Sequence, residues 1–220
     1  MDSVVNKEGG MSSNISVHGL LNVIADAVIS NEATLTELDS ALGDGDCGVG
    51  MKQGFSSVKN EIKDMQDATP ADLLKKTAMT LISTIGGTSG AIYGTAFMKM
   101  AGAASKLETI DLQAVSEILI AGLDGAKLRG EDTKIGDKTL IDAYEPAVYA
   151  FKEKIDAGLS LADALSATAD AAEKGSDSTI DMIAKKGRAS YLGERSIGHR
   201  DAGSYGIVVI AKAARDYVNT

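Results

Sequence analysis

The amino-acid sequence predicts an all-α protein, a single-domain barrel or bundle of about eight antiparallel helices. Apolar residues recur at spacings of three and four residues along most of the chain. Alternating, strand-like patterns are nearly absent, and only two prolines interrupt 220 residues, so long stretches are free to be helical. With 44% apolar residues, 4% aromatic residues and no Trp, the core must be mostly aliphatic.

The apolar stripes place the helices along the chain, in the order 20–28, 51–65, 73–85, 112–122, 144–155 and 161–172. A last apolar run, GIVVIA from Gly206, is compatible with a buried strand, but it continues into AKAARDYV and is therefore predicted to be helical. Residues 1–13 are polar and rich in Gly and Ser, so we expect a flexible segment followed by one helical domain over residues 14–220.

Helix start signals support these positions. Thr69, Pro70 and Asp72 predict an N-cap, a proline in the first turn and a capping box. Ser160 with Asp163, and Thr34 with Glu37, repeat the capping-box pattern.

The glycines gather in joints between the predicted helices, at residues 43–54, 86–94, 130–136 and 187–206. Because antiparallel helices return to the same end, we expect these joints to meet at one end of the domain.

Charge and cysteine content exclude several classes of function. The net charge of −9 argues against a nucleic-acid partner and against binding to an anionic membrane surface. No apolar run approaches the roughly 20 residues of a membrane span. Cys47 is the only cysteine, so no internal disulfide can form. With no secretory signal pattern at the start, we expect a cytoplasmic protein.

The strongest local signal is LDSALGDGDCG, which places Asp39, Asp44 and Asp46 within eight residues. Glycines between the aspartates allow the backbone to bend, and three carboxylates held together repel one another unless a cation joins them. The loop is not an EF-hand, because Val49 and Phe55 stand where that motif requires Gly and Glu. A polar Gly/Asp turn without metal is the alternative.

All-oxygen ligands favour Mg²⁺ or Ca²⁺. Because Mg²⁺ usually shares its coordination sphere with phosphate oxygens, the pattern indicates a phosphate ligand held through one or two metal ions.

Two further loops contain glycine and hydroxyl residues. In IGGTSGAIYG, Thr88 and Ser89 precede a helix and could contact an anion, or the glycines could serve only close packing of helices. In GEDTKIGDKT the spacing from Gly130 to Gly136 is one residue too long for a P-loop, and Asp137 intervenes before Lys138. Thr139 could cap the next helix, and Lys138 could bind a phosphate or be solvated.

The segment 185–203 gathers five cations and His199 in an otherwise acidic chain. This local reversal of charge favours an anionic ligand or an acidic partner, although a solvated loop would show the same pattern.

Taken together, four strings resemble the L subunit, or L domain, of dihydroxyacetone kinases, the DAK2-domain family. They are LDSALGDGDCG, GGTSGAIYGTAF, GDKTLIDA and KGRASYLGERSIGHRDAG, which span residues 38–206 in the family's order. The resemblance implies an eight-helix barrel that binds a nucleotide, ADP or ATP, at one end.

The resemblance also implies a set of site residues. It makes Asp39, Asp44 and Asp46 the ligands of two Mg²⁺ ions that bridge the nucleotide phosphates. It places around the nucleotide Cys47, Gly48, Val49, Gly50, Thr88, Ser89, Gly130, Thr139, Leu140, Arg188, Asp201, Ala202 and Gly203. Ala202 replaces a family proline, which should loosen that turn without abolishing it.

The phosphoryl donor stays open at this point. Subunits served by the phosphotransferase system usually carry His and Asn where this chain has Cys47 and Gly50, and Cys is more typical of ATP-dependent kinases. In one version ATP is consumed; in the other, bound ADP is a cofactor recharged by a phosphohistidine-carrying M subunit.

The resemblance implies no nucleophile on this chain, because a separate K subunit holds dihydroxyacetone. The oligomeric state, including a homodimer, is left open. Two alternatives remain: a kinase subunit for another keto-sugar such as erythrulose, and a nucleotide-sensing regulatory module without turnover.

Overall fold

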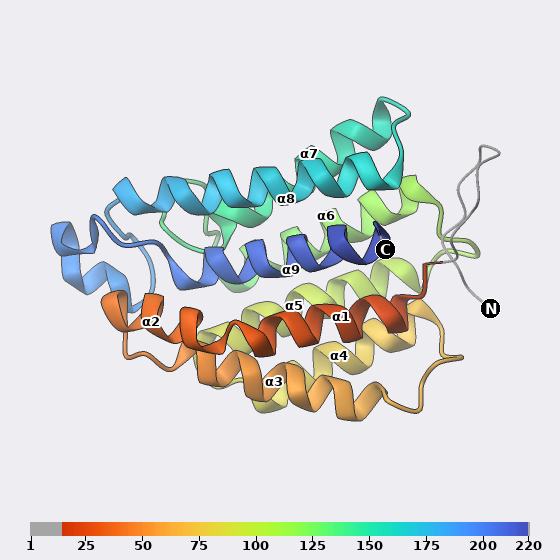
Figure 1. The fold of residues 1–220 in the computed structure, drawn as a ribbon, viewed down its shortest axis with the longest axis horizontal. Helices are drawn as coiled ribbons and strands as arrows, with labels where there is room; N and C mark the ends of the chain where they lie inside the picture. The colour runs from red at the N-terminus through yellow and green to blue at the C-terminus, as the bar shows by residue number, and fades with distance from the viewer. Residues whose placement is uncertain (1–14, 220) are drawn as a thin grey trace.

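The structure, a computed structural model, describes residues 15–219, which form helices and no β-strand (Figure 1). The α-helices are α1 (Val17–Ser30), α2 (Glu32–Leu42), α3 (Cys47–Ile62), α4 (Pro70–Thr84), α5 (Gly87–Ala104), α6 (Leu112–Arg129), α7 (Ile141–Asp156), α8 (Leu161–Ser178) and α9 (Ala202–Val218). Two 3₁₀ helices, η1 (Thr179–Asp181) and η2 (Arg188–Ser196), lie between α8 and α9. The expected flexible segment, residues 1–13, lies outside the described residues.

Eight of these helices form a closed ring. Helix α1 packs against α3, each helix from α3 to α8 packs against the next one in the chain, and α9 packs back against α1. Neighbouring helices of the ring run antiparallel, as in an up-and-down bundle (Figure 1). Helix α2 continues from α1 after the single residue Asn31 and packs against α3, α9 and η2. The predicted all-α barrel of about eight antiparallel helices is confirmed.

The up-and-down order sends alternate loops to opposite ends of the barrel (Figure 1). The loops at 43–46, 85–86, 130–140 and 179–201 share the end that lies on the left of Figure 1, which we call the loop end. The opposite end holds the connections after α3, α5 and α7 and the two termini of the described chain. The glycine-rich joints therefore meet at one end, as their order along the chain predicts.

The two ends differ in how their helices are capped. The N-cap side chains of α1, α4, α6 and α8, all at the opposite end, accept a hydrogen bond from the first turn; they are Ser16, Thr69, Asp111 and Ser160. This confirms the predicted caps at Thr69 and Ser160. At the loop end, α3, α5 and α7 have no such side-chain cap, and only α9 has one, from Asp201. Apart from α2, which follows α1 directly, the α-helices without a side-chain N-cap all start at the loop end.

Three expectations about helix boundaries were wrong. Thr34 does not cap a helix, because α2 begins earlier, at Glu32. Helix α3 ends at Ile62, short of Met65. The joint expected at 86–94 is mostly the start of α5, and two of its glycines, Gly90 and Gly94, allow close packing against the end of α4. A Cβ at Gly90 would lie 2.0 Å from a backbone oxygen of Ile85.

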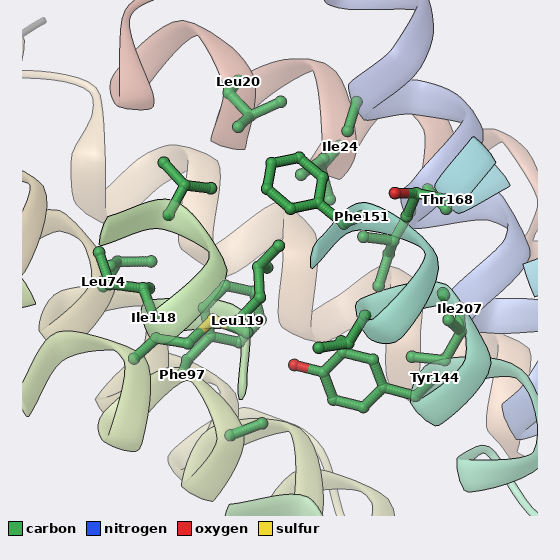
Figure 2. Close-up of a pocket in the computed structure, with 18 of the residues that line it drawn as sticks. Leu20, Ile24, Leu74, Phe97, Ile118, Leu119, Tyr144, Phe151, Thr168 and Ile207 are labelled. Atoms are coloured by element: carbon green, nitrogen blue, oxygen red, sulfur yellow. The ribbon is translucent and has the colours of Figure 1, made fainter. Parts of the chain in front are cut away.

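A cavity of about 260 Å³ lies inside the ring, lined by aliphatic and aromatic side chains of seven helices (Figure 2). In Figure 2, Leu20, Ile24, Phe97, Leu119 and Phe151 come from α1, α5, α6 and α7 and surround this space. None of the helices within residues 15–219 is long and apolar enough to span a bilayer.

The hydroxyl of Tyr144 is a buried polar group in this apolar wall. It has no hydrogen-bond partner among the residues that the structure describes. Burial raises the pKa of the Tyr144 phenol, which is therefore neutral at physiological pH.

We therefore expect Tyr144→Phe to leave the free energy of unfolding unchanged or to raise it by up to about 1 kcal/mol, because it removes an unsatisfied buried hydroxyl. Urea denaturation measures this difference. Tyr149→Phe, on the exposed side of the same helix, is the control. A loss of stability above about 1 kcal/mol in Tyr144→Phe alone would show that the hydroxyl has a partner.

Candidate functional site

The three predicted aspartates converge at the loop end. Asp39 lies in the last turn of α2, Asp44 lies in the following loop, and Asp46 is the N-cap residue of α3. One carboxylate oxygen of each lies within 4.8 Å of those of the other two. Gly45, between the last two, has a φ of +73°, a backbone conformation that favours glycine. Asp39 is half-buried, whereas Asp44 and Asp46 are exposed and accessible to a ligand.

Electrostatic repulsion is visible within this cluster. Partial loss of solvent contact raises the pKa of Asp46, and the neighbouring charges of Asp44 and Asp39 raise it further. The Arg188 guanidinium opposes this effect and forms an ion pair with Asp44. The Asp39 carboxylate accepts a hydrogen bond from the Cys47 amide, with an N–O distance of 3.1 Å. The cluster therefore concentrates negative charge that a cation would stabilise.

Cys47 follows the cluster directly and is half-buried. Burial, followed by the charges of Asp39, Asp201 and Asp46, raises the pKa of its thiol to about 12. The thiol therefore stays protonated at neutral pH and is a poor nucleophile.

The residues from Cys47 to Gly50, expected as a turn, form the first helical turn of α3. Gly48 is buried, and a Cβ there would lie 2.2 Å from the backbone oxygen of Glu32. Only glycine therefore fits where α3 crosses α2. Val49 points outward and is 53% exposed.

Thr88 and Ser89 lie in the first turn of α5, with Thr88 exposed. Ile85 links this turn to α3, because a Cβ at Gly50 would lie 3.7 Å from the Ile85 Cγ2 atom. The starts of α3 and α5 are therefore close neighbours. Within residues 15–219, no hydrogen bond or ion pair joins Thr88 or Ser89 to the three aspartates.

The remaining predicted residues form a second side of the site. Gly203, in the first turn of α9, lies beside Leu140, since a Cβ at Gly203 would lie 3.4 Å from the Leu140 Cβ. Ala202 is buried in the same turn. Asp201 caps α9 by accepting from the Ser204 amide, with an N–O distance of 2.6 Å. Burial raises the pKa of Asp201 to about 7, although the Ser204 hydrogen bond lowers it.

Gly130 and Thr139 lie in the loop region between α6 and α7. Gly130 directly follows α6, and its carbonyl accepts a hydrogen bond from the Thr133 hydroxyl. The Thr139 hydroxyl accepts from the Ile141 amide at 3.2 Å, close to the capping role that the sequence suggests. Within residues 15–219, neither residue forms a hydrogen bond with the three aspartates, and Thr139 bonds instead with the first turn of α7.

Sequence reasoning missed the buried charged residues that shape this loop. The Asp142 carboxylate accepts hydrogen bonds from the amides of Gly136 and Thr139, at 2.5 and 2.7 Å. The pattern Thr139-x-x-Asp142 has the form of a capping box and could have identified it. Lys138, expected to be solvated or to bind a phosphate, is instead only 1% exposed.

Comparisons with known sequences agree with one another. A family model described as the DAK2 domain matches residues 41–216. The chain is 40% identical over 193 residues, 88% of the chain and 91% of the relative, to the "PEP-dependent dihydroxyacetone kinase 1, ADP-binding subunit DhaL" of Listeria innocua. It is also 40% identical over 186 residues, 83% of the chain and 88% of the relative, to the "PEP-dependent dihydroxyacetone kinase, ADP-binding subunit DhaL" of Escherichia coli.

The fold is also similar to a solved structure. The crystal structure of the dihydroxyacetone kinase of C. freundii aligns with a TM-score of 0.73 and 23% sequence identity. The alignment covers 98% of this chain but only 38% of that longer chain. At this level of identity the likeness shows the fold alone.

We expect Asp201→Asn to become more stable relative to the wild type as the pH rises from 5 to 8. The pKa of Asp201 is about 7 in the folded protein, above its ordinary value of 3.8, so its stabilising effect is complete below pH 3.8 and is lost as the pH rises through 7. Asn keeps a helix cap without the charge. The gain should be on the order of 1–3 kcal/mol.

Urea denaturation at several pH values, without Mg²⁺ or nucleotide, measures this gain. Asp111→Asn is the matched control, since it removes a carboxylate from the N-cap of α6 at the opposite end of the barrel. A difference between wild type and Asp201→Asn that does not change with pH would contradict the raised pKa.

Proposed function

Since this chain belongs to the DAK2-domain family, we propose that it is the nucleotide-carrying subunit of a dihydroxyacetone kinase. In this proposal Mg²⁺ and an adenine nucleotide bind at the loop end of the barrel, and the nucleotide's terminal phosphoryl group passes to dihydroxyacetone held by a separate K subunit. The observation that carries the proposal is the convergence of Asp39, Asp44 and Asp46 within 4.8 Å beside uncapped helix starts.

The three carboxylates suit a magnesium site. Their donors are all oxygen, the atom type that Mg²⁺ prefers, and two of the three side chains are exposed. Asp39, Asp44 and Asp46 would hold two ions that neutralise the charge of the nucleotide phosphates. Without metal, Arg188 pairs with Asp44, so this arginine is free to turn to a phosphate once a metal satisfies the carboxylate.

The helix starts suit the phosphate groups. The first-turn amides of α3 and α5 point to the loop end, and their N-cap residues, Asp46 and Gly86, make no capping hydrogen bond with a side chain. Such amides, together with the positive end of the helix dipole, bind anions. We assign Cys47, Gly48, Val49 and Gly50 on α3, and Thr88 and Ser89 on α5, to phosphate contact.

The second side of the site suits the nucleoside. Leu140 and Gly203 lie against each other, and Asp201 and Ala202 directly precede Gly203 at the start of α9. We assign these residues, with Gly130 and Thr139, to the base and sugar. Because Leu140 is apolar and only half-buried, this side offers packing surface more than charge.

In this proposal the chain positions the nucleotide phosphates and neutralises their charge, and it supplies no nucleophile. The Cys47 thiol is held in its protonated form, and no other thiol exists in the chain. The aspartates and helix amides would hold the terminal phosphate at the open end of the barrel, where a partner-bound hydroxyl can reach it. Both sequence relatives are named ADP-binding and PEP-dependent, so we propose that ADP is a retained cofactor recharged by a phosphohistidine-carrying M subunit.

Isothermal titration should show ADP binding that requires Mg²⁺ and is lost in Asp39→Asn and Asp44→Asn. Loss of an outer-shell group already costs roughly 10–100-fold in metal affinity, so loss of a direct ligand should cost at least that much. Asp64→Asn, an exposed aspartate at the opposite end, is the matched control. Equal ADP affinity with and without Mg²⁺ would contradict the three-aspartate site.

The donor can be identified from the purified protein. Mass spectrometry should detect co-purified ADP, and a reconstituted reaction with a K subunit and dihydroxyacetone should proceed with a phosphohistidine M subunit and not with ATP alone. Turnover with ATP alone, with ADP released each cycle, would show that ATP is a consumed substrate. Absence of a phosphorylated product with either donor would favour a regulatory module.

A further inference from the structure

Lys138 is a buried cation at the otherwise exposed loop end. Its side chain is 1% exposed, and its backbone has a φ of +60°, a left-handed conformation that a non-glycine residue seldom adopts. A buried ammonium is unfavourable unless hydrogen bonds and nearby charges compensate it. The surroundings of Lys138 must therefore provide both.

Four backbone carbonyl oxygens surround the Lys138 ammonium, and all of them belong to residues 179–201, which we call the α8–α9 segment. The distances from Nζ are 2.6 Å to His199, 2.7 Å to Thr179, 2.7 Å to Ser196 and 3.2 Å to Met182. An ammonium has three N–H groups, so four acceptors exceed its donors. The arrangement resembles the carbonyl rings that replace the hydration shell of K⁺.

Nearby carboxylates contribute to this compensation. Burial lowers the pKa of Lys138, and the charges of Asp201, Asp181 and Asp142 oppose that lowering. The four carbonyl oxygens around the ammonium, which we call the cage, therefore lie in surroundings that favour a positive charge as well as hydrogen-bond donors.

Outside the Lys138 contacts, single polar contacts attach the α8–α9 segment to the barrel. Arg200 forms ion pairs with Glu173 and Asp177 of α8, and the Lys185 amide donates to the Asp137 carbonyl at 3.1 Å.

The segment has only a small core of its own. Only three of its side chains are buried, Thr179, Ala184 and Ser196, and two of these are polar. Hydrogen bonds within the segment, such as Gly198 N–H to Ile180 O at 2.8 Å, close its loops but do not attach it to the barrel. A 3₁₀ helix and irregular backbone with so small a core need a polar anchor.

The same segment carries two residues of the proposed site. Arg188 forms an ion pair with Asp44, which lies outside the segment in the loop between α2 and α3. Asp201, the last residue of the segment, caps α9. Lys138 contacts the Met182 carbonyl before η2 and the His199 carbonyl after it, and η2 is the 3₁₀ helix that begins with Arg188. A shift of the segment would therefore move Arg188 away from the aspartates.

We propose that Lys138 is a positioning residue, the fixed cation around which the α8–α9 segment folds, and that it thereby holds Arg188 and Asp201 at the nucleotide site. The consequence for nucleotide binding rests on the proposed function, whereas the folding of the segment does not. The prediction that distinguishes this role from ordinary packing is that a free cation of similar size can replace the ammonium.

The test compares Lys138→Ala, which leaves room for a cation, with Lys138→Met, which fills the cage with an apolar chain. Lys134→Ala, an exposed lysine of the same loop, is the control. Hydrogen exchange read by mass spectrometry should show at least tenfold faster exchange in residues 179–201 of both Lys138 variants, with the barrel helices still protected. Mg–ADP affinity should fall at least tenfold in both.

Ammonium or potassium chloride should restore protection and Mg–ADP affinity in Lys138→Ala, whereas choline chloride at the same ionic strength should not. Neither salt should restore Lys138→Met. Wild-type exchange in Lys138→Ala, or exchange that is the same in all three salts, would overturn the proposal.

Two further outcomes are also decisive. If Lys138→Ala destabilises the whole chain, the midpoint of its thermal unfolding is measured in ammonium chloride and in choline chloride instead of hydrogen exchange. Equal midpoints in the two salts overturn the proposal. If the wild type does not bind Mg–ADP, the proposed function fails, while the cation dependence of exchange in residues 179–201 still decides the role of Lys138.

Discussion

The contact between α1 and α9 closes the ring of helices, and the arrangement of the loop end depends on it. An even number of antiparallel helices in a closed ring must place alternate loops at the same end. The aspartate loop, the start of α5, the α6–α7 loop and the α8–α9 segment are far apart in sequence, yet they become neighbours for this reason alone (Figure 1). Opening the ring would separate α9, and with it Asp201 and Gly203, from the aspartates.

The two ends of the barrel use the same helix physics for different purposes. At the opposite end, serine, threonine or aspartate side chains satisfy the first-turn amides, which favours stability. At the loop end, α3 and α5 start without such caps, next to three mutually repelling carboxylates. The loop end therefore holds helix starts without N-cap side-chain bonds and excess negative charge together, and a metal–phosphate ligand would suit both.

Much of the fold and part of the site could be predicted before the structure. Helical periodicity and local caps such as Thr69 and Ser160 depend on residues three or four positions apart, which a sequence displays directly. The aspartate cluster was also local, because Asp39, Asp44 and Asp46 lie within one helix end and one turn. Errors arose where a local pattern had two meanings, as at 86–94, where glycines that suggest a loop instead allow α5 to pack closely on the end of α4.

The sequence by itself determined the fold class, the end at which the loops gather and the acidic character of the site, since each follows from spacing and residue type. Only the tertiary structure decided which side chains are buried and what they contact. Lys138 is the clearest case: a lysine in a polar loop is normally solvated, and nothing within a few residues of it indicates a cage built from carbonyls 41 to 61 positions away. Backbone carbonyls are the same in every residue, so their convergence on one cation is set by the path of the chain and leaves no mark in the pattern of side chains.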